Sequence, residues 1–170
     1  MPLPPCNGEF DWTNVRGWLS KEEGNELSRL ANGKVVLEVG TFCGRSTLAM
    51  AETARRVFCV DTFAGYTDPG TSNTLNEALC NFERSEHKHK IIVIKGRQED
   101  VLPTMDLSGI DLVFYDADHS EQSTARGIRL LEEAGLPETA MSFSMTTMPW
   151  TREWCELWMP GAFRKAKCHG

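Results

Sequence analysis

The sequence has no long hydrophobic run and no excess of positive charge. No stretch approaches the run of about eighteen apolar residues that a membrane-spanning helix needs. Lysine and arginine total 18 against 24 aspartate and glutamate residues, a formal net charge of −6, and the basic residues are scattered along the chain. We therefore expect neither a membrane nor a nucleic acid as partner.

Metal-binding, disulfide and secretion signatures are also missing. None of the six cysteines forms a Cys-x-x-Cys pair, so free thiols are favoured over disulfides or a zinc site. His87 and His89 lie in a charged stretch before a strand pattern, which favours a solvated turn over a metal site. Met1 to Pro5 have neither the charged start nor the apolar centre of a signal peptide. These features predict a cytoplasmic protein.

The length and the mixed strand and helix patterns predict one α/β domain. The 170 residues can bury a core but are few for two domains. We place this domain at residues 20–170, after an N-terminal segment over residues 1–19. Within that segment, Phe10 to Trp18 carry spaced apolar residues, which suits packing on the sheet edge or covering a ligand cleft.

The chain is organised around a glycine turn between a strand and a helix. Val35 to Val39 form an apolar strand pattern, and Gly40 and Gly44 enclose a turn before a helical stretch that begins at Ser46. The spacing differs from Gly-x-Gly-x-x-Gly and from the phosphate-binding loop, which has four residues between its glycines and then lysine. Glu38 also disfavours a phosphate, because a carboxylate repels an anion and suits an ammonium group.

Three further strands are expected, over Val57 to Val60, Ile91 to Ile94 and Leu112 to Tyr115. Asp61 follows the first of them, seventeen residues after Gly44. That is about the distance at which a strand–helix–strand unit places an acid to bind ribose hydroxyls. The alternative for Asp61 is a solvated carboxylate at the end of a strand.

Titratable residues crowd the end of the strand over Leu112 to Tyr115. Asp116, Asp118 and His119 fall within four residues, at the sheet edge where a ligand site is expected. Such a density of charge is hard to explain by packing. The alternative is that Asp118 or Ser120 caps the next helix and that His119 is merely exposed.

Three segments together carry a resemblance to a known family. They cover residues 36–47, 57–63 and 111–119, and the last contains the sequence Asp-Ala-Asp-His. In this order and spacing they resemble the class I S-adenosylmethionine-dependent methyltransferases, most closely the small-molecule O-methyltransferases. The similarity extends over about residues 27–131. It implies a Rossmann-like, doubly wound and mostly parallel sheet of about five strands, flanked by helices.

The resemblance implies a place for each part of the cofactor S-adenosylmethionine. Its methionine end would lie at Glu38, its ribose at Asp61 with Thr62 beside it, and its adenine at Gln98. The turn that would cradle it contributes Gly40, Thr41, Phe42, Gly44 and Ser46.

The resemblance also implies catalytic roles after the fourth strand. The family's counterpart of Asp116 faces the methyl-transfer site and is a cation ligand in metal-dependent members. The residue three positions later is commonly a lysine implicated in deprotonating the substrate hydroxyl. Here it is His119, whose unperturbed pKa of about 6.5 suits a base near neutral pH. We therefore expect methyl transfer to the hydroxyl of a small molecule, with Asp116 and His119 as catalytic residues.

The last part of the chain departs from the family. Residues 140–147 contain no carboxylate where the family places a supporting metal ligand, so we expect no divalent metal. The residues after Trp158 contain no pattern for the family's C-terminal strand hairpin, so we expect a shortened C-terminus. A non-catalytic S-adenosylmethionine-binding or interaction module remains the main alternative, and a nucleotide-binding enzyme a third. The sequence is compatible with an oligomer and does not identify the acceptor.

Overall fold

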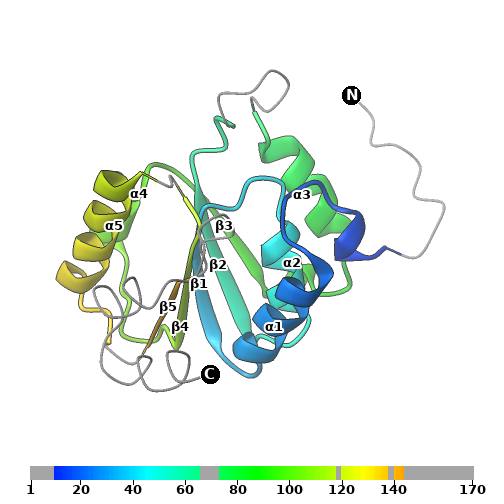
Figure 1. The fold of residues 1–170 in the computed structure, drawn as a ribbon, viewed down its shortest axis with the longest axis horizontal. Coiled ribbons are helices and arrows are strands. Elements are labelled where there is room, and N and C mark those ends of the chain that lie inside the picture. Colours follow the sequence, from blue (N-terminus) through cyan, green and yellow to red (C-terminus); the bar gives the residue numbers. More distant parts are fainter. Residues whose placement is uncertain (1–9, 66–72, 118–119, 138–139, 144–170) are drawn as a thin grey trace.

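The described residues form one parallel sheet with helices on both faces (Figure 1). The computed structural model describes residues 10–65, 73–117, 120–137 and 140–143. The five strands are paired in the order β3-β2-β1-β4-β5, and every pair is parallel. Their bounds are β1 Val35–Val39, β2 Arg56–Asp61, β3 Ile91–Lys95, β4 Leu112–Tyr115 and β5 Met141–Phe143. This confirms the predicted Rossmann-like class with about five strands.

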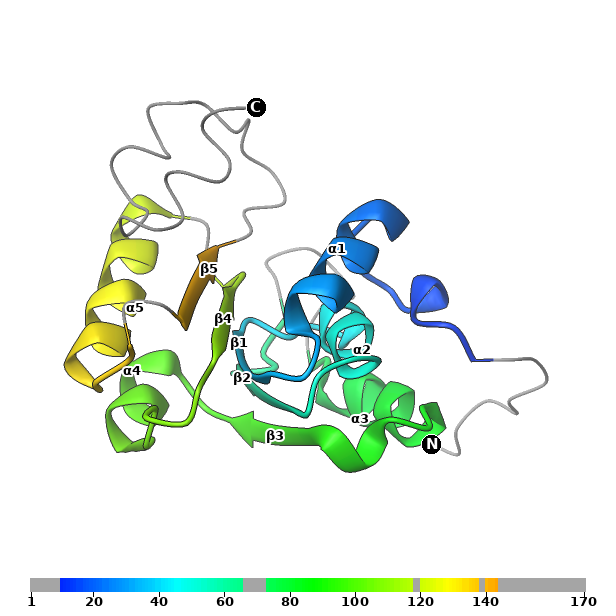
Figure 2. The same ribbon diagram turned by 90° about the horizontal axis from the view of Figure 1, so that it is seen from below.

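The helices divide between the two faces of the sheet. Figure 2 shows α1, α2 and α3 on one side and α4 and α5 on the other. The α-helices are α1 Lys21–Ala31, α2 Arg45–Ala51, α3 Leu75–Arg84, α4 Gln98–Val101 and α5 Glu121–Glu133. The short 3-10 helices that lie wholly within the described residues are η1 Trp12–Asn14, η2 Lys88–Lys90 and η3 Leu102–Thr104. None of the helices in the described part of the chain is long and apolar enough to cross a bilayer.

The sheet buries apolar side chains on both faces, because successive strand residues point to opposite sides. Val36 of β1 joins the core under α1, α2 and α3, whereas Leu37 and Val39 join the core under α4 and α5. All three side chains are almost completely buried. The apolar run Ile91 to Ile94 predicts a strand buried on both faces, but these residues of β3 are only half-buried, because β3 lies at the edge of the sheet.

The sequence Ser-Lys-Glu-Glu over residues 20–23 is a capping-box pattern, and it starts the first helix. Ser20 is the N-cap of α1, and its hydroxyl accepts a hydrogen bond from the Glu23 amide at 3.2 Å. The Glu23 carboxylate in turn accepts a hydrogen bond from the Ser20 amide at 2.8 Å, which completes the capping box.

The described part of the N-terminal segment packs on the domain. Trp12, Val15 and Leu19 are at most 6% exposed and belong to the core beneath α1 and α2. Packing was one of the two expected alternatives for this segment. The division at residue 20 stays a prediction, and the predicted absence of a C-terminal hairpin concerns residues outside the described part of the chain.

The strand order creates a switch point beside β1. This strand pairs with β2 on one side and with β4 on the other, so the chain leaves the two carboxyl ends in opposite directions. Ligands of open α/β sheets bind at such a point, because the loops diverge there and leave room. The glycine turn after β1 and Asp116 after β4 are therefore neighbours.

Candidate functional site

The turn after β1 is packed so closely that both of its glycines are required. Gly40 has φ 97°, and a Cβ built on it would lie 2.2 Å from the carbonyl oxygen of Asp116. Gly44 has φ 88°, and a Cβ there would lie 2.3 Å from the ring of Phe82. Side chains at either position would be strained in backbone conformation and would clash. The turn is thus wedged between the end of β4 and helix α3.

Glu38 is a buried carboxylate beneath this turn. It is 0% exposed, and its carboxylate oxygens accept hydrogen bonds from the hydroxyls of Ser46, Thr47 and, at 3.2 Å, Thr41. Burial raises its pKa to about 7, the three hydroxyls act in the opposite direction, and the charge of Asp116 adds to the increase. Glu38 therefore joins β1 to the turn and to α2, and its proposed contact with a methionine ammonium stays a prediction.

Ser46 and Thr47 both donate to Glu38, but only Ser46 was predicted as a site residue. Ser46 is a predicted cofactor residue, and the structure places its hydroxyl on Glu38. Thr47 was not singled out, although it is fully buried and donates to the same carboxylate. Neither the spacing nor the type of Thr47 distinguishes it in the sequence from other residues of the helix.

Asp61 connects the end of β2 to the same turn. One carboxylate oxygen accepts hydrogen bonds from the amides of Thr41 at 2.7 Å and Phe42 at 2.8 Å. The other accepts from the Phe63 amide at 2.6 Å. Asp61 is half-buried, and its neighbour Thr62 is exposed and caps the amide of Ala64. Asp61 shapes the turn, while its predicted contact with ribose remains a prediction.

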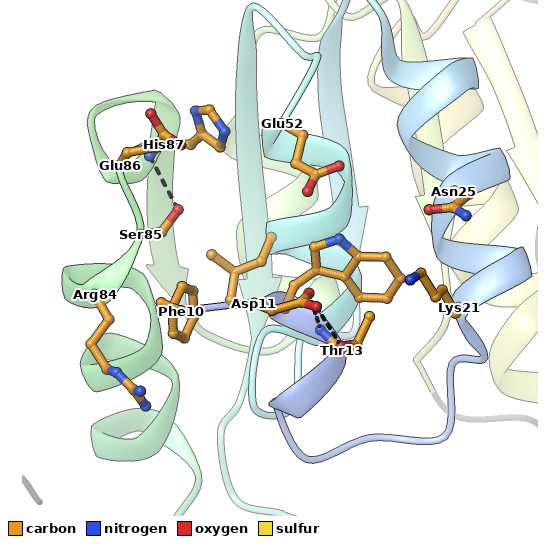
Figure 3. A pocket seen from close by; sticks show the side chains of 12 residues that line it. Phe10, Asp11, Thr13, Lys21, Asn25, Glu52, Arg84, Ser85, Glu86 and His87 are labelled. Atoms are coloured by element: carbon orange, nitrogen blue, oxygen red, sulfur yellow. Dashed lines mark hydrogen bonds between the residues drawn. The ribbon is translucent and has the colours of Figure 1, made fainter. Parts of the chain in front are cut away.

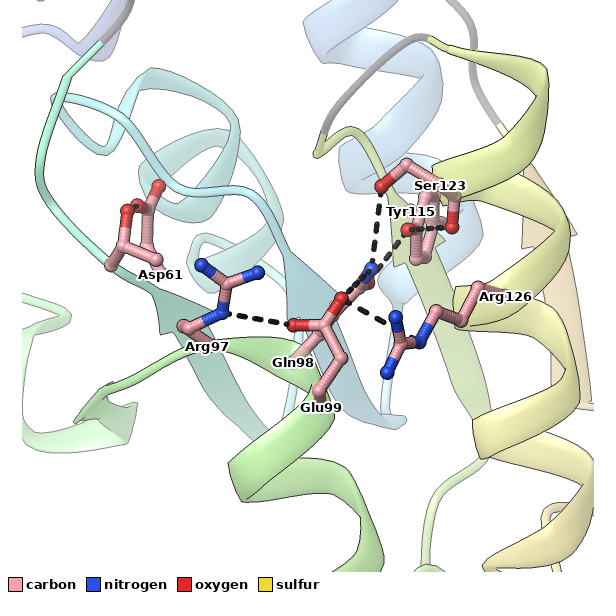
Figure 4. Close-up of polar contacts among 8 residues, drawn as sticks. Asp61, Arg97, Gln98, Glu99, Tyr115, Ser123 and Arg126 are labelled. Atoms are coloured by element: carbon pink, nitrogen blue, oxygen red, sulfur yellow. Dashed lines mark hydrogen bonds and ion pairs between the residues drawn. The ribbon is translucent and has the colours of Figure 1, made fainter.

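Gln98 lies at the start of α4, where it meets β4 and α5 (Figure 4). Its carbonyl oxygen accepts a hydrogen bond from the Tyr115 hydroxyl at 2.6 Å, and its amide nitrogen lies 3.5 Å from the Ser123 hydroxyl. Gln98 is half-buried. Its role toward adenine stays a prediction. Tyr115 was missed by the sequence analysis because it fits the buried strand pattern, in which its hydroxyl is not apparent.

Glu99 forms an ionic cluster beside Gln98. Its carboxylate lies 3.4 Å from the guanidinium of Arg97 and 4.0 Å from that of Arg126. Burial acts to raise the pKa of Glu99, but backbone and Gln98 hydrogen bonds and the two arginines together lower it. Because the arginine side chains are well exposed, these pairs contribute little stability.

Of the two predicted catalytic residues, one lies in the described part of the chain. Asp116 is half-buried at the end of β4, and its amide donates to the Val39 carbonyl at 2.8 Å. It therefore lies beside Gly40 and close enough to Glu38 to affect its pKa. His119 and Asp118 lie outside the described residues. Within the described residues, no three histidine, cysteine or acidic side chains are grouped to hold a metal.

A separate hollow of about 620 Å³ lies on the outer side of α2. Figure 3 shows it between the N-terminal segment, α1 and the end of α3, with Asp11, Lys21, Glu52 and Arg84 around it. None of its lining residues is a predicted cofactor or catalytic residue. Charges of both signs surround it, and we assign it no ligand.

The fold and the site together define a Rossmann-like α/β domain with a glycine turn after the first strand. Residues 37–143, more than half of the chain, match the family model described as a methyltransferase domain. The chain therefore belongs to the methyltransferase domain family.

Relatives of known name support the same family. A Mycobacterium tuberculosis protein named as a probable O-methyltransferase is 32% identical over 112 residues, which are 65% of this chain and 48% of that protein. The chain thus spans about half the length of this relative.

Solved structures share the fold. The cofactor-bound protein Rv0187 from MTB is 31% identical with a TM-score of 0.53, over 69% of this chain and 55% of that one. An O-methyltransferase from Bacillus cereus in complex with SAH is 21% identical with a TM-score of 0.59, over 77% of this chain and 60% of that one. At this lower identity the likeness concerns the fold alone.

Proposed function

We propose that the chain binds S-adenosylmethionine at the carboxyl edge of the sheet and transfers its methyl group to the hydroxyl of a small molecule. The observation that carries the proposal is the meeting of Glu38, Asp61 and Asp116 around the Gly40–Gly44 turn. Family membership and relatives named as O-methyltransferases support it.

The chemistry of the turn suits this cofactor. Glu38 is a buried carboxylate whose hydrogen-bond partners among the described residues are hydroxyls, with no lysine or arginine paired to it. A cationic ligand bound at the turn would favour the charged form of Glu38, whose pKa burial raises to about 7. An anionic phosphate would be repelled, which argues against the nucleotide alternative. Asp61 at the neighbouring strand end offers acceptor oxygens suited to ribose hydroxyls.

The protein's own task in the reaction is positioning and proton removal. S-adenosylmethionine supplies a methyl group that is already activated on a sulfonium. Asp116 lies beside the turn, so its carboxylate would hold the acceptor hydroxyl near the reacting edge. We retain His119 as the base that takes the hydroxyl proton, on the sequence argument alone.

The acceptor class and the cellular location are also proposals. An acidic chain without a basic stripe supports a small-molecule acceptor rather than a nucleic acid. Cys43, Cys59 and Cys80 are free thiols in the described residues, which supports a reducing compartment such as the cytoplasm.

Calorimetry with the demethylated cofactor, S-adenosylhomocysteine, tests the binding half of the proposal. We expect saturable heat with both cofactor forms and none with NAD or ATP. Asp61→Asn should weaken binding by about tenfold to a hundredfold, because a charged acceptor contributes about 1.5–3 kcal/mol. Asp106→Asn is the matched control, since Asp106 is exposed and precedes β4, at the amino ends of the strands and away from the candidate site.

The outcomes separate the candidate functions. Heat with NAD or ATP alone would overturn the methyltransferase proposal. Cofactor binding with no methyl transfer to any of a panel of hydroxylated aromatic and aliphatic acceptors would favour a non-catalytic binding module. Equal affinity of wild type and Asp61→Asn would show that Asp61 serves the turn and not the ligand.

A further inference from the structure

Residues Asp11–Trp18, which we call the strap, lie across the beginning of α2. The first part of the strap is the 3-10 helix η1, which contacts α2, and Trp12 and Val15 are buried there. The dark blue segment in Figure 1 shows this course beside α2 and α3. The strap therefore lies next to the candidate cofactor turn, although it is distant from it in sequence.

The start of the strap is stiffened by its own side chains. Asp11 caps η1, since its carboxylate accepts hydrogen bonds from the Thr13 amide at 2.9 Å and the Thr13 hydroxyl at 2.8 Å (Figure 3). The amide hydrogen bond is the main reason that the pKa of Asp11 is lowered. This cap fixes the direction of the carbonyl groups that follow.

The Arg45 side chain, directly after the turn, donates hydrogen bonds to the strap. Arg45 is the first residue of α2, and its Nη1 donates to the carbonyls of Thr13 and Val15, both at 2.7 Å. Its guanidinium also lies 5.7 Å from the centre of the Trp12 ring. A Cβ on Gly17 would come within 3.1 Å of Arg45 Cδ, so glycine leaves the room that the arginine chain needs.

The position of Arg45 is unfavourable for a helix taken alone. A cation in the first turn opposes the helix dipole. The Nε of Arg45 is also buried, with no hydrogen-bond partner among the described residues. The two hydrogen bonds to carbonyl groups of the strap offset these costs and hold Arg45 in place.

The other end of the strap reaches the turn directly. The Arg16 guanidinium lies 4.9 Å from the centre of the Phe42 ring and donates to the Glu77 carboxylate of α3 at 2.6 and 3.1 Å. The Trp18 ring centre is 5.2 Å from that of Phe42. Phe42 has φ 51°, and its amide is one of the three that donate to the Asp61 carboxylate. The strap thus packs on the residue whose backbone Asp61 orients.

We propose that Arg45 is a positioning residue that couples the strap to the candidate cofactor turn, so that cofactor affinity depends on the strap being in place. Arg45 fastens the strap at Thr13 and Val15, and the fastened strap packs Arg16 and Trp18 on Phe42. The proposal rests on the proposed function for the identity of the ligand, but the coupling itself is a property of the free protein.

The experiment compares Arg45→Gln with wild type in two measurements. In the free protein, hydrogen exchange of the Thr41 and Phe42 amides should become about tenfold faster, because the turn loses its cover. The dissociation constant of S-adenosylhomocysteine should rise by about tenfold, a change typical of coupled sites. Arg45→Lys should recover part of both effects, since an ammonium group can still donate to both carbonyls.

Two controls separate positioning from general stability. Arg55→Gln removes an exposed arginine whose nearest acid lies 3.6 Å away, and it should change neither measurement. Ile128→Val removes a buried methyl group from α5 on the other face of the sheet, so it lowers stability without touching the strap.

Unchanged exchange at Thr41 and Phe42 in Arg45→Gln would overturn the proposal. An affinity loss no greater than that of Ile128→Val at a matched loss of stability would also overturn it. If S-adenosylhomocysteine fails to bind wild type, the proposed function fails, and the exchange measurement still decides the coupling.

Discussion

At the scale of single residues, the carboxylates near the turn differ in what surrounds them. Asp61 is half-buried and accepts three backbone amides, which are partners that stabilise a negative charge. Glu38 is fully buried and has hydroxyl partners, and burial dominates its pKa. Glu38 is the last residue but one of β1 and Asp61 is the last residue of β2, so their surroundings and not their positions distinguish them.

Glu38 should make the stability of the free protein depend on pH. Its folded pKa of about 7 lies above the ordinary 4.5, so the folded protein binds this proton more tightly than the unfolded chain. The stabilising contribution is complete below about pH 4.5 and is lost as the pH rises through about 7. Relative to Glu38→Gln, wild type should lose on the order of 3 kcal/mol of unfolding free energy between pH 5 and 8.

Urea unfolding at several pH values measures this difference. Glu86→Gln, which alters an exposed carboxylate, is the control and should keep the wild-type pH dependence. Parallel curves for wild type and Glu38→Gln would show that Glu38 is ionised throughout, with its three hydroxyl donors outweighing burial.

At the scale of elements, α5 packs closely on β4 at Gly127 and Tyr115, a contact that the sequence pattern does not predict. Gly127 lies inside α5, where a glycine is normally a weak point. A Cβ on it would lie 2.3 Å from the Tyr115 hydroxyl oxygen and 2.5 Å from the ring. The same hydroxyl binds Gln98, so this contact joins β4, α4 and α5.

Gly127→Ala should destabilise the protein by up to about 2 kcal/mol. Alanine improves helix propensity by about 1 kcal/mol, but overpacking costs about 1–3 kcal/mol. We expect the clash to dominate because Tyr115 is 3% exposed and its hydroxyl is bonded, so the ring has little room to move. The free energy of unfolding in urea measures the change.

Gly109→Ala is the matched control for this substitution. A Cβ on Gly109 would meet nothing within 4 Å, so its effect on stability should be small. A Gly127→Ala protein as stable as wild type would mean that α5 can shift away from Tyr115 at little cost.

At the scale of the whole molecule, the strand order brings separate loops to one edge. The turn after β1, Asp61 at the end of β2, Gln98 after β3 and Asp116 after β4 lie at the carboxyl ends of strands that run in the same direction. A ligand bound along the carboxyl ends of these strands would contact segments that follow most of the strands in the sheet. It should therefore stabilise the fold as a unit.

S-adenosylhomocysteine should raise the melting temperature in a concentration-dependent way. A ligand at a hundred times its dissociation constant adds about 2.7 kcal/mol, or about 5–10 °C for a chain of this size. Thermal unfolding with increasing ligand measures the shift, and ATP at the same concentrations is the control. A melting temperature that does not move with S-adenosylhomocysteine would contradict binding to the folded state.

The local sequence by itself determined the elements and much of their order. The apolar run before Gly40 and the capping box at Ser20 are signals over a few residues, and they depend on backbone conformation and burial that neighbouring residues dictate. The order and spacing of the strand-end motifs predicted the family and the end of the sheet at which Asp61 and Asp116 both border the glycine turn. The location of the strand-end motifs can be predicted without a tertiary structure, because the carboxyl ends of parallel strands all lie on the same side of the sheet.

Only the tertiary structure decided what those side chains contact. Glu38 binds Ser46 and Thr47, and Asp61 binds the backbone of the turn, so both hold the site together whatever they do for a ligand. The grip of Arg45 on Thr13 and Val15 joins residues about thirty positions apart. No periodicity encodes such contacts, because they depend on how the folded elements approach one another and not on the spacing of residues along the chain.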